Sequence, residues 1–485
     1  MGPSIRLAGA ATLPLLVATF LLLLSLPFFL LGLPACPPRG FLCTPALYRR
    51  PAAAAGSASE SAPTTLDHLV FGIASSARSL PQRSGYLRRW WDPARLRGFV
   101  FLDSPLPGGN AGDGLPPLRV SNDTSWLPYS FPRGLRSAVR VARVVRELVE
   151  AAEGLPGVRW VVLGDDDTVF FPENLAASLR RRDWERWHYV GASSEAVEQN
   201  EKYSFDMAFG GGGFALSWPL ARALVRVLDS CLVRYAHLYG SDARVFSCLA
   251  ELGVGMTRDH GFHQIQASFS IKTNPPVDLR GDIFGMLTAH PLTPLVSLHH
   301  LDYVEPIFPG MDRVQALEHL FEAVRIDPGR ILQQTVCYDQ LALHTVSISW
   351  GYAVQVFNGN ILLPDILSWQ RTFTPWKRGL GASSSHYMFN TREFPKDVCK
   401  RPVIFFLESI ASEINGIYSK YSKHTMGTCP QNKASEKLKQ IKVSSSLHSG
   451  QFLRRQCCDI FPSTTDEVME INIRECRDEL ISMSP

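Results

Sequence analysis

The sequence is organised around RWVVLGDDD, residues 159–167, in which an apolar run ends in three adjacent carboxylates. Such a run predicts a β-strand that is buried on both faces. The side chains of Asp165, Asp166 and Asp167 then lie at the carboxyl end of that strand, where ligands bind in open α/β sheets. Three adjacent negative charges repel one another unless a cation lies among them. A solvated acidic turn is the alternative interpretation of this triplet.

The carboxylate cluster also indicates which cation it would hold. Mg²⁺ and Mn²⁺ prefer oxygen ligands and are often shared between protein carboxylates and phosphate oxygens. The triplet therefore predicts a site for a divalent cation and a substrate that contains a diphosphate.

The segments around this strand alternate between the two periodicities of strands and helices. Strand alternating with helix predicts an α/β fold with a mostly parallel sheet that helices cover on both faces. We expect strands at residues 66–75, 96–103 and 188–194, and helices at 78–91, 133–152 and 218–233, with another helix opening at 240–245.

The helix expected at 133–152 carries four arginines that share one face, because their spacing is three or four residues. They are Arg133, Arg136, Arg140 and Arg143. A solvated stripe and a surface facing a diphosphate are both open interpretations.

The amino-terminal region predicts membrane attachment. Residues 7–35 carry no charge and are long enough to span a bilayer. A signal anchor is the favoured interpretation and a cleaved signal peptide the alternative. Residues 1–6 would then be a short cytosolic tail. Residues 36–65, rich in Pro, Ala, Ser and Gly, would form a flexible stem.

Composition narrows the class of protein. A net charge of +4 and 19% charged residues in a chain of 485 argue against nucleic acid as a partner. Ten cysteines suit an oxidising compartment, and the absence of a C-x-x-C pair argues against zinc. Cys231 and Cys248 lie near the ends of two consecutive predicted helices, so we expect a disulfide between them.

The character of the chain changes near residue 302. An amphipathic helix is expected at 312–324 and strand-like segments at 346–356 and 403–406, and six cysteines follow. Residues 303–485 are therefore predicted to form a separate, disulfide-containing α+β domain that is rich in strands. The polar stretch at 431–449 suggests disorder.

Four motifs in order resemble one family. They are WVVLGDDDTVFFPENL (160–175), FGGGGFALS (209–217), GSDARV (240–245) and TRDHGFH (257–263). Residues 66–302 resemble the Fringe and core β1,3-galactosyltransferase group of inverting GT-A glycosyltransferases, above all the plant Fringe-related proteins with a domain of unknown function. The resemblance implies a GT-A catalytic domain in the Golgi lumen, held to the Golgi membrane by a single N-terminal helix in type II orientation.

The resemblance also implies roles for individual residues. Mn²⁺, or Mg²⁺, would be held by Asp165, Asp167 and His263. Asp166 would face the donor sugar or its ribose, and Asp242 would be the general base. His299 and His300 remain alternatives to His263 as metal ligand.

Two further features of the family map onto this chain. The glycine run, with Gly211, Gly212 and Gly213, would form the wall beneath donor and acceptor sugars, and Arg83 would contact the nucleotide. The chain departs from Fringe at Ser241, where Fringe has an acidic residue beside its base. A helix-capping role is the structural alternative for Asp242.

The function that these features predict is an inverting, Mn²⁺-dependent transferase. It would move a hexose or N-acetylhexosamine from a UDP-sugar to a hydroxyl of a glycan, polysaccharide or small glycoside. A sugar-binding or scaffold protein of the secretory pathway that keeps the fold without catalysis is the alternative. A metal-dependent phosphoesterase is a third possibility.

Overall fold

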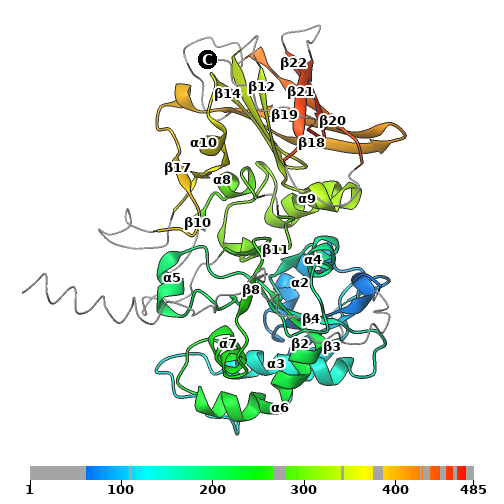
Figure 1. Ribbon diagram of the computed structural model, residues 1–485, viewed down its shortest axis with the longest axis vertical. Helices are drawn as coiled ribbons and strands as arrows, with labels where there is room; N and C mark the ends of the chain where they lie inside the picture. Colours follow the sequence, from blue (N-terminus) through cyan, green and yellow to red (C-terminus); the bar gives the residue numbers. More distant parts are fainter. Residues whose placement is uncertain are drawn as a thin grey trace, which may run out of the picture. The chain divides into compact units, whose positions relative to one another are not determined.

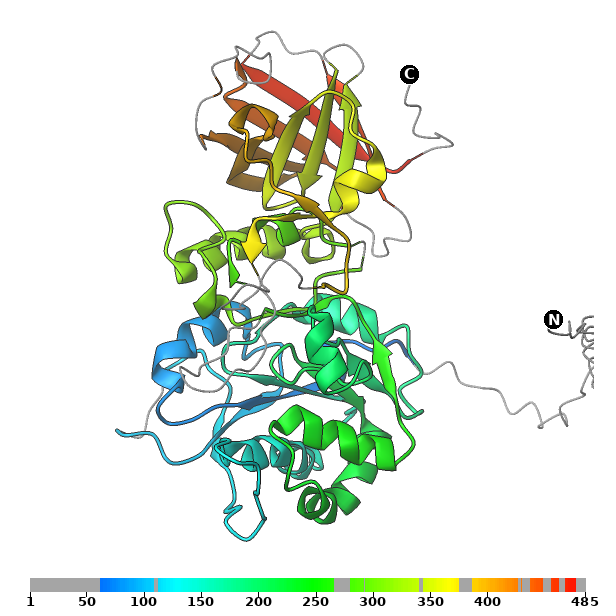
Figure 2. The same ribbon diagram turned by 90° about the vertical axis from the view of Figure 1, so that its left-hand side faces the viewer.

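The computed structural model describes residues 62–108, 112–265, 280–291, 293–339, 343–374, 386–425, 429, 437–447, 455–461 and 467–476 (Figures 1 and 2). Residues 63–485 form one compact unit. The predicted tail, anchor and stem lie outside the described residues, apart from the last few positions of the stem. Among the helices that are described, none has the length and apolar character needed to cross a bilayer.

A seven-stranded sheet forms the centre of the amino-terminal half. Neighbours in it are parallel except for β7, which is antiparallel to both β4 and β6. The predicted mostly parallel sheet and the strand before the acidic triplet are thus confirmed. The strand order is β3 (Leu118–Val120), β2 (Gly98–Leu102), β1 (Leu69–Ala74), β4 (Trp160–Asp165), β7 (Phe214–Ser217), β6 (Tyr189–Gly191) and β8 (Met256–Arg258).

Helices cover both faces of this sheet, as Figure 1 shows. The alternation along β4 explains this, since Trp160 and Val162 belong to one buried cluster while Val161 and Leu163 belong to the other. One face packs α3 (Ser137–Ala152), α6 (Trp218–Arg234) and α7 (Ser241–Glu251), and the other packs α2 (Leu80–Trp90) and α4 (Pro172–Leu179). The disulfide predicted between Cys231 and Cys248 joins α6 to α7.

The strand order reverses beside β1. The chain runs from β1 to β2 on one side and later returns as β4 on the other side. In doubly wound sheets the crevice for a nucleotide lies at such a reversal, outside the carboxyl ends of the strands. The acidic triplet follows β4 directly and so lies at this crevice.

A small sheet completes the neighbourhood of the triplet. Strand β11 (Ser297–His299) pairs with β5 (Val169–Phe170) on one side and β9 (Phe262–Gln264) on the other. This pairing brings the histidines near residue 300 beside a turn more than a hundred residues earlier in the chain.

The carboxyl-terminal half contains an eight-stranded sheet that is antiparallel except between β20 and β22. Three disulfides join residues of this half: Cys337–Cys458, Cys399–Cys429 and Cys457–Cys476. The strand order is β12 (Gln334–Asp339), β13 (His344–Ser349), β14 (Ala353–Asn358), β18 (Val403–Glu413), β19 (Gly416–His424), β20 (Gln440–Ser445), β22 (Val468–Arg474) and β21 (Cys457–Phe461).

Two predictions for this half need correction. The strand-like segment at 346–356 is a hairpin, because the chain turns between β13 and β14. The stretch at 431–449 is not disordered throughout, since its residues 440–445 form β20. There Ile441 and Val443 are buried and alternate with polar residues, a strand pattern that the overall polarity of the stretch concealed.

The remaining elements connect these sheets. Strand β10 (Arg280–Gly281) pairs with β16 (Phe373–Thr374), and β15 (Trp369–Arg371) pairs with β17 (Thr391–Glu393). The other helices are α5 (Val197–Lys202), α8 (Phe284–Leu287), α9 (Arg313–Ile326) and α10 (Leu363–Leu367), with 3-10 turns at Leu66–His68, Leu301–Tyr303, Pro328–Arg330 and Val398–Lys400.

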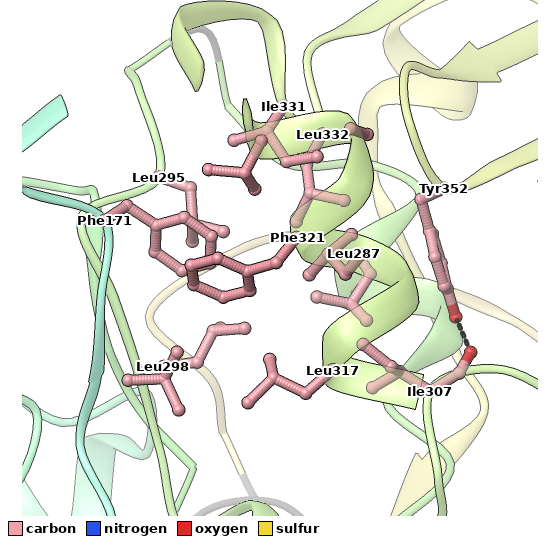
Figure 3. Close-up of a cluster of buried hydrophobic side chains, with 14 of the residues drawn as sticks. Phe171, Leu287, Leu295, Leu298, Ile307, Leu317, Phe321, Ile331, Leu332 and Tyr352 are labelled. Atoms are coloured by element: carbon pink, nitrogen blue, oxygen red, sulfur yellow. Dashed lines mark hydrogen bonds between the residues drawn. The ribbon is translucent and has the colours of Figure 1, made fainter. Parts of the chain in front are cut away.

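Helix α9 joins the apolar interiors of the two halves (Figure 3). The rings of Phe171 and Phe321 stack with their centroids 5.4 Å apart. On the other side of the cluster, the hydroxyl of Tyr352 donates a hydrogen bond of 2.8 Å to the carbonyl of Ile307. One buried cluster thus continues across residue 302, and the domain boundary expected there stays a prediction.

Candidate metal and nucleotide site

The turn after β4 is held by its own backbone and by the glycine run. The Thr168 hydroxyl accepts from the Asp165 amide at 2.8 Å and donates to the Gly211 carbonyl at 2.7 Å. These two bonds fix the acidic triplet against the neighbouring loop.

Asp166 faces inward. One of its oxygens accepts hydrogen bonds of 2.6 Å from both Ser75 and Ser79, and the other accepts one of 2.8 Å from Arg83. With its side chain almost wholly buried, Asp166 ties the end of β1 and the first turn of α2 to the triplet. The role of facing the donor stays a prediction for this residue.

Arg83, predicted to contact a nucleotide, lies within the cluster. Its guanidinium is 3.1 Å from Asp167 and 3.3 Å from Asp302, whose other oxygen accepts a hydrogen bond of 2.6 Å from Tyr86. Burial alone would lower the pKa of Arg83, but Asp167 and Asp166 raise it above its ordinary value. The side chain is still 24% exposed, so a fixed cation borders the triplet and can meet a phosphate.

Asp167 meets two histidines. Its Oδ1 lies 3.1 Å from Nε2 of His299 and its Oδ2 lies 3.7 Å from Nε2 of His300. The two imidazole rings stack with centroids 3.7 Å apart, and His300 adopts a left-handed backbone conformation (φ 61°). One ligand atom from each of the three residues lies within 4.8 Å of the others, a spacing that a metal ion could bridge.

The electrostatics of Asp167 and His299 are complementary. Burial would raise the pKa of Asp167, but His299, His300 and Arg83 together hold it well below its usual range. Burial would likewise lower the pKa of His299, and Asp167 reverses this and raises it. Asp167 is therefore a carboxylate at neutral pH.

These residues fit a divalent cation. Imidazole and carboxylate together suit Mn²⁺ and related ions. Asp167 Oδ2 is buried and accepts no hydrogen bond from any described residue, although Arg83 pairs with it electrostatically. Asp165 lies 3.9 Å from His299 Nε2 and keeps 38% of its side chain exposed, which leaves it open to a ligand. Desolvation is the largest cause that raises the pKa of Asp165 to about 7, and the neighbouring charges of Asp167 and Asp166 act in the same direction while His299 opposes them.

His263, the favoured metal ligand, is not brought to the triplet. Its Nδ1 lies 3.1 Å from Glu195 and its Nε2 lies 2.9 Å from Nε2 of His290. The next residue on β9, Gln264, faces the site instead and meets Nδ1 of His299 at 2.9 Å. Successive strand residues point to opposite faces, so only one of this pair can face the triplet. The structure favours the alternative ligands, His299 and His300.

The glycine run lies against the metal cluster. A Cβ on Gly211 would lie 2.0 Å from Cε1 of His299, so any larger residue would displace that ring. Gly213 has a φ of +85°, which favours glycine. The carbonyl of Gly212 accepts a hydrogen bond from the Ser297 hydroxyl. The run is therefore a wall beside the cluster, and its contact with sugars stays a prediction.

Asp242, the predicted base, lies in the first turn of α7. It lines a small cavity of about 30 Å³ together with Asp165 and Gly210. Its Oδ1 accepts a hydrogen bond of 2.9 Å from the Ala243 amide, while the N-cap of the helix is Gly240, so the capping role considered for Asp242 is wrong. Burial raises the pKa of Asp242, partly opposed by hydrogen bonds from backbone amides.

The four arginines do not share one face of a helix as predicted, because α3 begins at Ser137: Arg136 is its N-cap, and Arg133 lies before it with a φ of 59°. Arg136 donates to backbone carbonyls of the preceding loop and Arg143 pairs with Asp229 at 2.9 Å. Arg140 differs, because it donates to the Ser75 carbonyl at the end of β1 and its charge acts on Asp165 and Asp166. Among these arginines, Arg140 is the one whose described contacts border the site.

Sequence reasoning missed several residues that hold this site. They are Ser75, Ser79, Tyr86, Gln264 and Asp302. The signal for Gln264 was available, because the period of two along a strand places it opposite His263. The sequence carried no such signal for the two serines, since hydroxyl residues after a strand are common.

Comparison with protein families places the chain. A family model described as "Protein of unknown function, DUF604" matches residues 199–458, more than half of its length. The chain belongs to the DUF604 family. The match includes the glycine run, Asp242 and both histidines of the cluster, and it begins after the acidic triplet.

Other comparisons add little about this DUF604 protein. No curated protein matches it. Among solved structures, an active-site mutant of LgtC is 12% identical with a TM-score of 0.33, over 51% of this chain and 94% of the other. Core-mannan synthase A of Aspergillus fumigatus, in its Mn/GDP form, is 12% identical with a TM-score of 0.27, over 44% and 76%. Similarity at this level supports no conclusion about fold or function.

Proposed function

We propose that this chain is a metal-dependent glycosyltransferase that uses a UDP-sugar donor. The observation that carries the proposal is the position of Asp167, His299 and His300, with Asp165 open beside them, at the crevice where the strand order reverses. That crevice is where nucleotides bind in doubly wound sheets. The resemblance of the motifs to the Fringe group supports the same reaction.

Asp167, His299 and His300 would hold Mn²⁺ or Mg²⁺, with Asp165 available as a further ligand. A bound cation supplies Lewis-acid stabilisation of the negative charge on a departing nucleoside diphosphate. Arg83 supplies a second, fixed positive charge next to the same position, and the network around Asp166 keeps that arginine in place.

Asp242 would accept the proton of the acceptor hydroxyl as that oxygen attacks the anomeric carbon. Its raised pKa suits this role, because a stronger base removes a proton more readily once it is ionised. Because the mechanism has a base but no protein nucleophile, the acceptor oxygen displaces the nucleoside diphosphate in one step. The configuration at the anomeric carbon is therefore inverted. Asp242 and Asp165 share one cavity, so base and metal cluster adjoin.

The decisive experiment measures free UDP released by the purified protein from UDP-galactose, UDP-glucose and UDP-N-acetylglucosamine, with and without Mn²⁺. We expect Mn²⁺-dependent release from at least one donor, accelerated by acceptor glycosides. The variant Asp167→Asn should lose this activity. The matched control is Asp206→Asn, at an exposed aspartate outside the site, which should keep it.

Three outcomes would contradict the proposal. Undiminished turnover by Asp167→Asn would remove the metal assignment. Donor binding without UDP release, across all donors and acceptors, would favour a non-catalytic sugar-binding or scaffold protein. Cleavage of UDP-sugars that depends on neither acceptor nor Asp242 would indicate a phosphoesterase.

The proposal includes a location in the Golgi membrane through a single amino-terminal helix, with the catalytic part in the lumen. Four disulfides among the described residues agree with an oxidising compartment. Protease protection of an epitope at the carboxyl terminus in intact microsomes tests this orientation, and cleavage of that epitope without detergent would contradict it.

A further inference from the structure

A second pocket, of about 270 Å³, lies on the other side of β9 from the metal cluster. Glu195, His263 and Trp369 line it. The polar residues that line one side of the pocket lie at or just after the carboxyl ends of β6 and β8. These strands run parallel to β4, so the pocket lies at the same edge of the sheet as the acidic triplet. Ligands bind at this edge in open α/β sheets.

The pocket has a buried acceptor that is not satisfied. Glu195 is 6% exposed, and its Oε1 meets the Gln264 amide at 3.2 Å and Nδ1 of His263 at 3.1 Å. Its Oε2 has no hydrogen-bond partner among the described residues. A buried carboxyl oxygen without a partner is costly, and a ligand hydroxyl would relieve that cost.

The histidines behind Glu195 fix where protons lie. Nδ1 of His290 donates to the Pro291 carbonyl at 2.8 Å, so in the neutral ring Nε2 is the acceptor. Nε2 of His263 must then donate to it, which leaves one proton for the contact between His263 and Glu195. Whichever of the two holds this proton, Oε2 of Glu195 remains able to accept a hydrogen bond from a ligand.

The opposite wall is aromatic and comes from the carboxyl-terminal half. The rings of Trp369 and Phe389 lie 3.6 Å apart, and Trp369 lies 6.2 Å from the ring of His263. Backbone hydrogen bonds hold this wall in place, because the Met388 amide donates to the Glu195 carbonyl at 2.9 Å and the Val197 amide donates to the His386 carbonyl at 3.0 Å. An aromatic face opposite a hydroxyl acceptor suits a ring that is apolar on its faces and hydroxylated at its edge.

We infer that this pocket, which Arg258 and Arg455 also line, binds a saccharide, with a sugar ring against Trp369 and a hydroxyl donating to Glu195. Saccharide binding by this pocket does not depend on the proposed function. Only the identification of that saccharide as the acceptor of glycosyl transfer rests on it. The volume lies near the lower limit of small-molecule pockets, about 300 Å³, and suits a short glycan end rather than a long chain. The carboxyl-terminal half would then take part in acceptor recognition.

Saturation-transfer NMR on the full chain tests the inference, with methyl β-galactoside, methyl β-glucoside and methyl β-N-acetylglucosaminide as probes and with no Mn²⁺ or UDP present. We expect at least one probe to bind. Its affinity should fall about tenfold in Trp369→Leu and in Glu195→Gln. Trp369→Phe should keep most of the binding, and Trp187→Phe, at an exposed tryptophan, should match the unaltered chain.

The inference is overturned if none of the three glycosides binds, or if Trp369→Leu binds as tightly as the unaltered chain. Melting temperatures show whether each variant folds. If Glu195→Gln does not fold, the binding measured for Trp369→Leu decides the test alone. Calorimetry of UDP with Mn²⁺ separates the two proposals. Glycoside binding without Mn²⁺-dependent UDP binding would remove the proposed function and leave the saccharide pocket, and the reverse result would remove only the pocket.

Discussion

The Nδ1 atom of His299 lies 2.9 Å from the Oε1 atom of Gln264. An amide oxygen can only accept, so the imidazole donates from Nδ1. Nε2, which lies 3.1 Å from Asp167, is then the nitrogen that can give its lone pair to a cation. Metal-binding histidines are commonly oriented in this way by a hydrogen bond at their other nitrogen.

Replacing Gln264 should therefore weaken metal binding without removing a ligand. We expect Gln264→Ala to lower Mn²⁺ affinity about 10- to 100-fold, the usual cost of losing such a partner. Calorimetric titration with Mn²⁺ in the presence of UDP measures this. Gln82→Ala, at an exposed glutamine on α2, is the control, and equal affinities for the two variants would contradict the role of Gln264.

The two candidate histidines should behave differently. His299→Ala removes a ligand and should reduce Mn²⁺ affinity by at least about 100-fold, whereas His263→Ala should change it by only about threefold or less, since His263 faces the other side of β9. The same titration checks both variants. A larger loss of Mn²⁺ affinity in His263→Ala than in His299→Ala would mean that His263 is the metal ligand, as the motif indicated.

Asp242 should govern the acidic side of the pH–rate profile. As a base it must be ionised, so kcat/KM falls as pH drops through its pKa, and burial moves this limb to higher pH than an ordinary aspartate would give. Asp242→Asn should lower kcat by about 10²- to 10⁴-fold while UDP binding with Mn²⁺ is retained. Loss of UDP binding in this variant would mean that Asp242 holds the structure of the site instead.

Glu195 should make stability depend on pH in a direction unusual for a carboxylate. Burial raises its pKa to about 8 from an ordinary value of 4.5. Between these values the folded chain binds a proton that the unfolded chain lacks, so this contribution is complete below pH 4.5 and is lost as pH rises through 8. Glu195→Gln lacks the contribution. Its loss of stability relative to the unaltered chain should grow by about 2 kcal/mol between pH 7 and pH 5.

Urea unfolding at the two pH values measures this difference, with Glu201→Gln, at an exposed glutamate, as the control. His263 acts in the opposite sense, because burial lowers its pKa to about 3 and its folded form resists protonation below pH 6.5. The comparison therefore has to be made between variants at each pH. A difference that shrinks toward pH 5 would contradict the assignment for Glu195.

The ring stack between Phe171 and Phe321 should support both halves of the chain. Phe321→Ala removes a buried ring from α9 and should lower the free energy of unfolding by about 3–5 kcal/mol. Phe205→Ala, at an exposed ring, should change it by less than about 0.5 kcal/mol. Thermal unfolding followed by circular dichroism measures both, and similar melting temperatures would contradict a shared core.

Local pattern was enough to predict the parallel sheet. The run before Asp165 is apolar at every position, which only a strand covered on both faces needs, and the expected helices followed from their periodicity. The acidic triplet and Asp242 were visible because their residue types are unusual in those positions. Each of these signals lies within a few residues of the feature that it predicts.

The partners of the site depended on long-range pairing. His299 reaches Asp167 because β11 lies between β5 and β9, a register that no local pattern specifies. Motif proximity favoured His263, although strand alternation turns it away. Trp369 lies more than a hundred and fifty residues after Glu195 in the chain and lines the same pocket. No local pattern near either residue predicts that they come together.

The adjacent residues Cys457 and Cys458 on β21 bond to different partners, Cys476 and Cys337. Oxidative folding must therefore sort two neighbouring thiols, and an isomerase has a clear task in maturing this protein. Cys458 also fastens the last strand of the eight-stranded sheet to the first, β12. A truncation before Cys476 would leave the thiol of Cys457 free beside that fastening, where thiol exchange could open it.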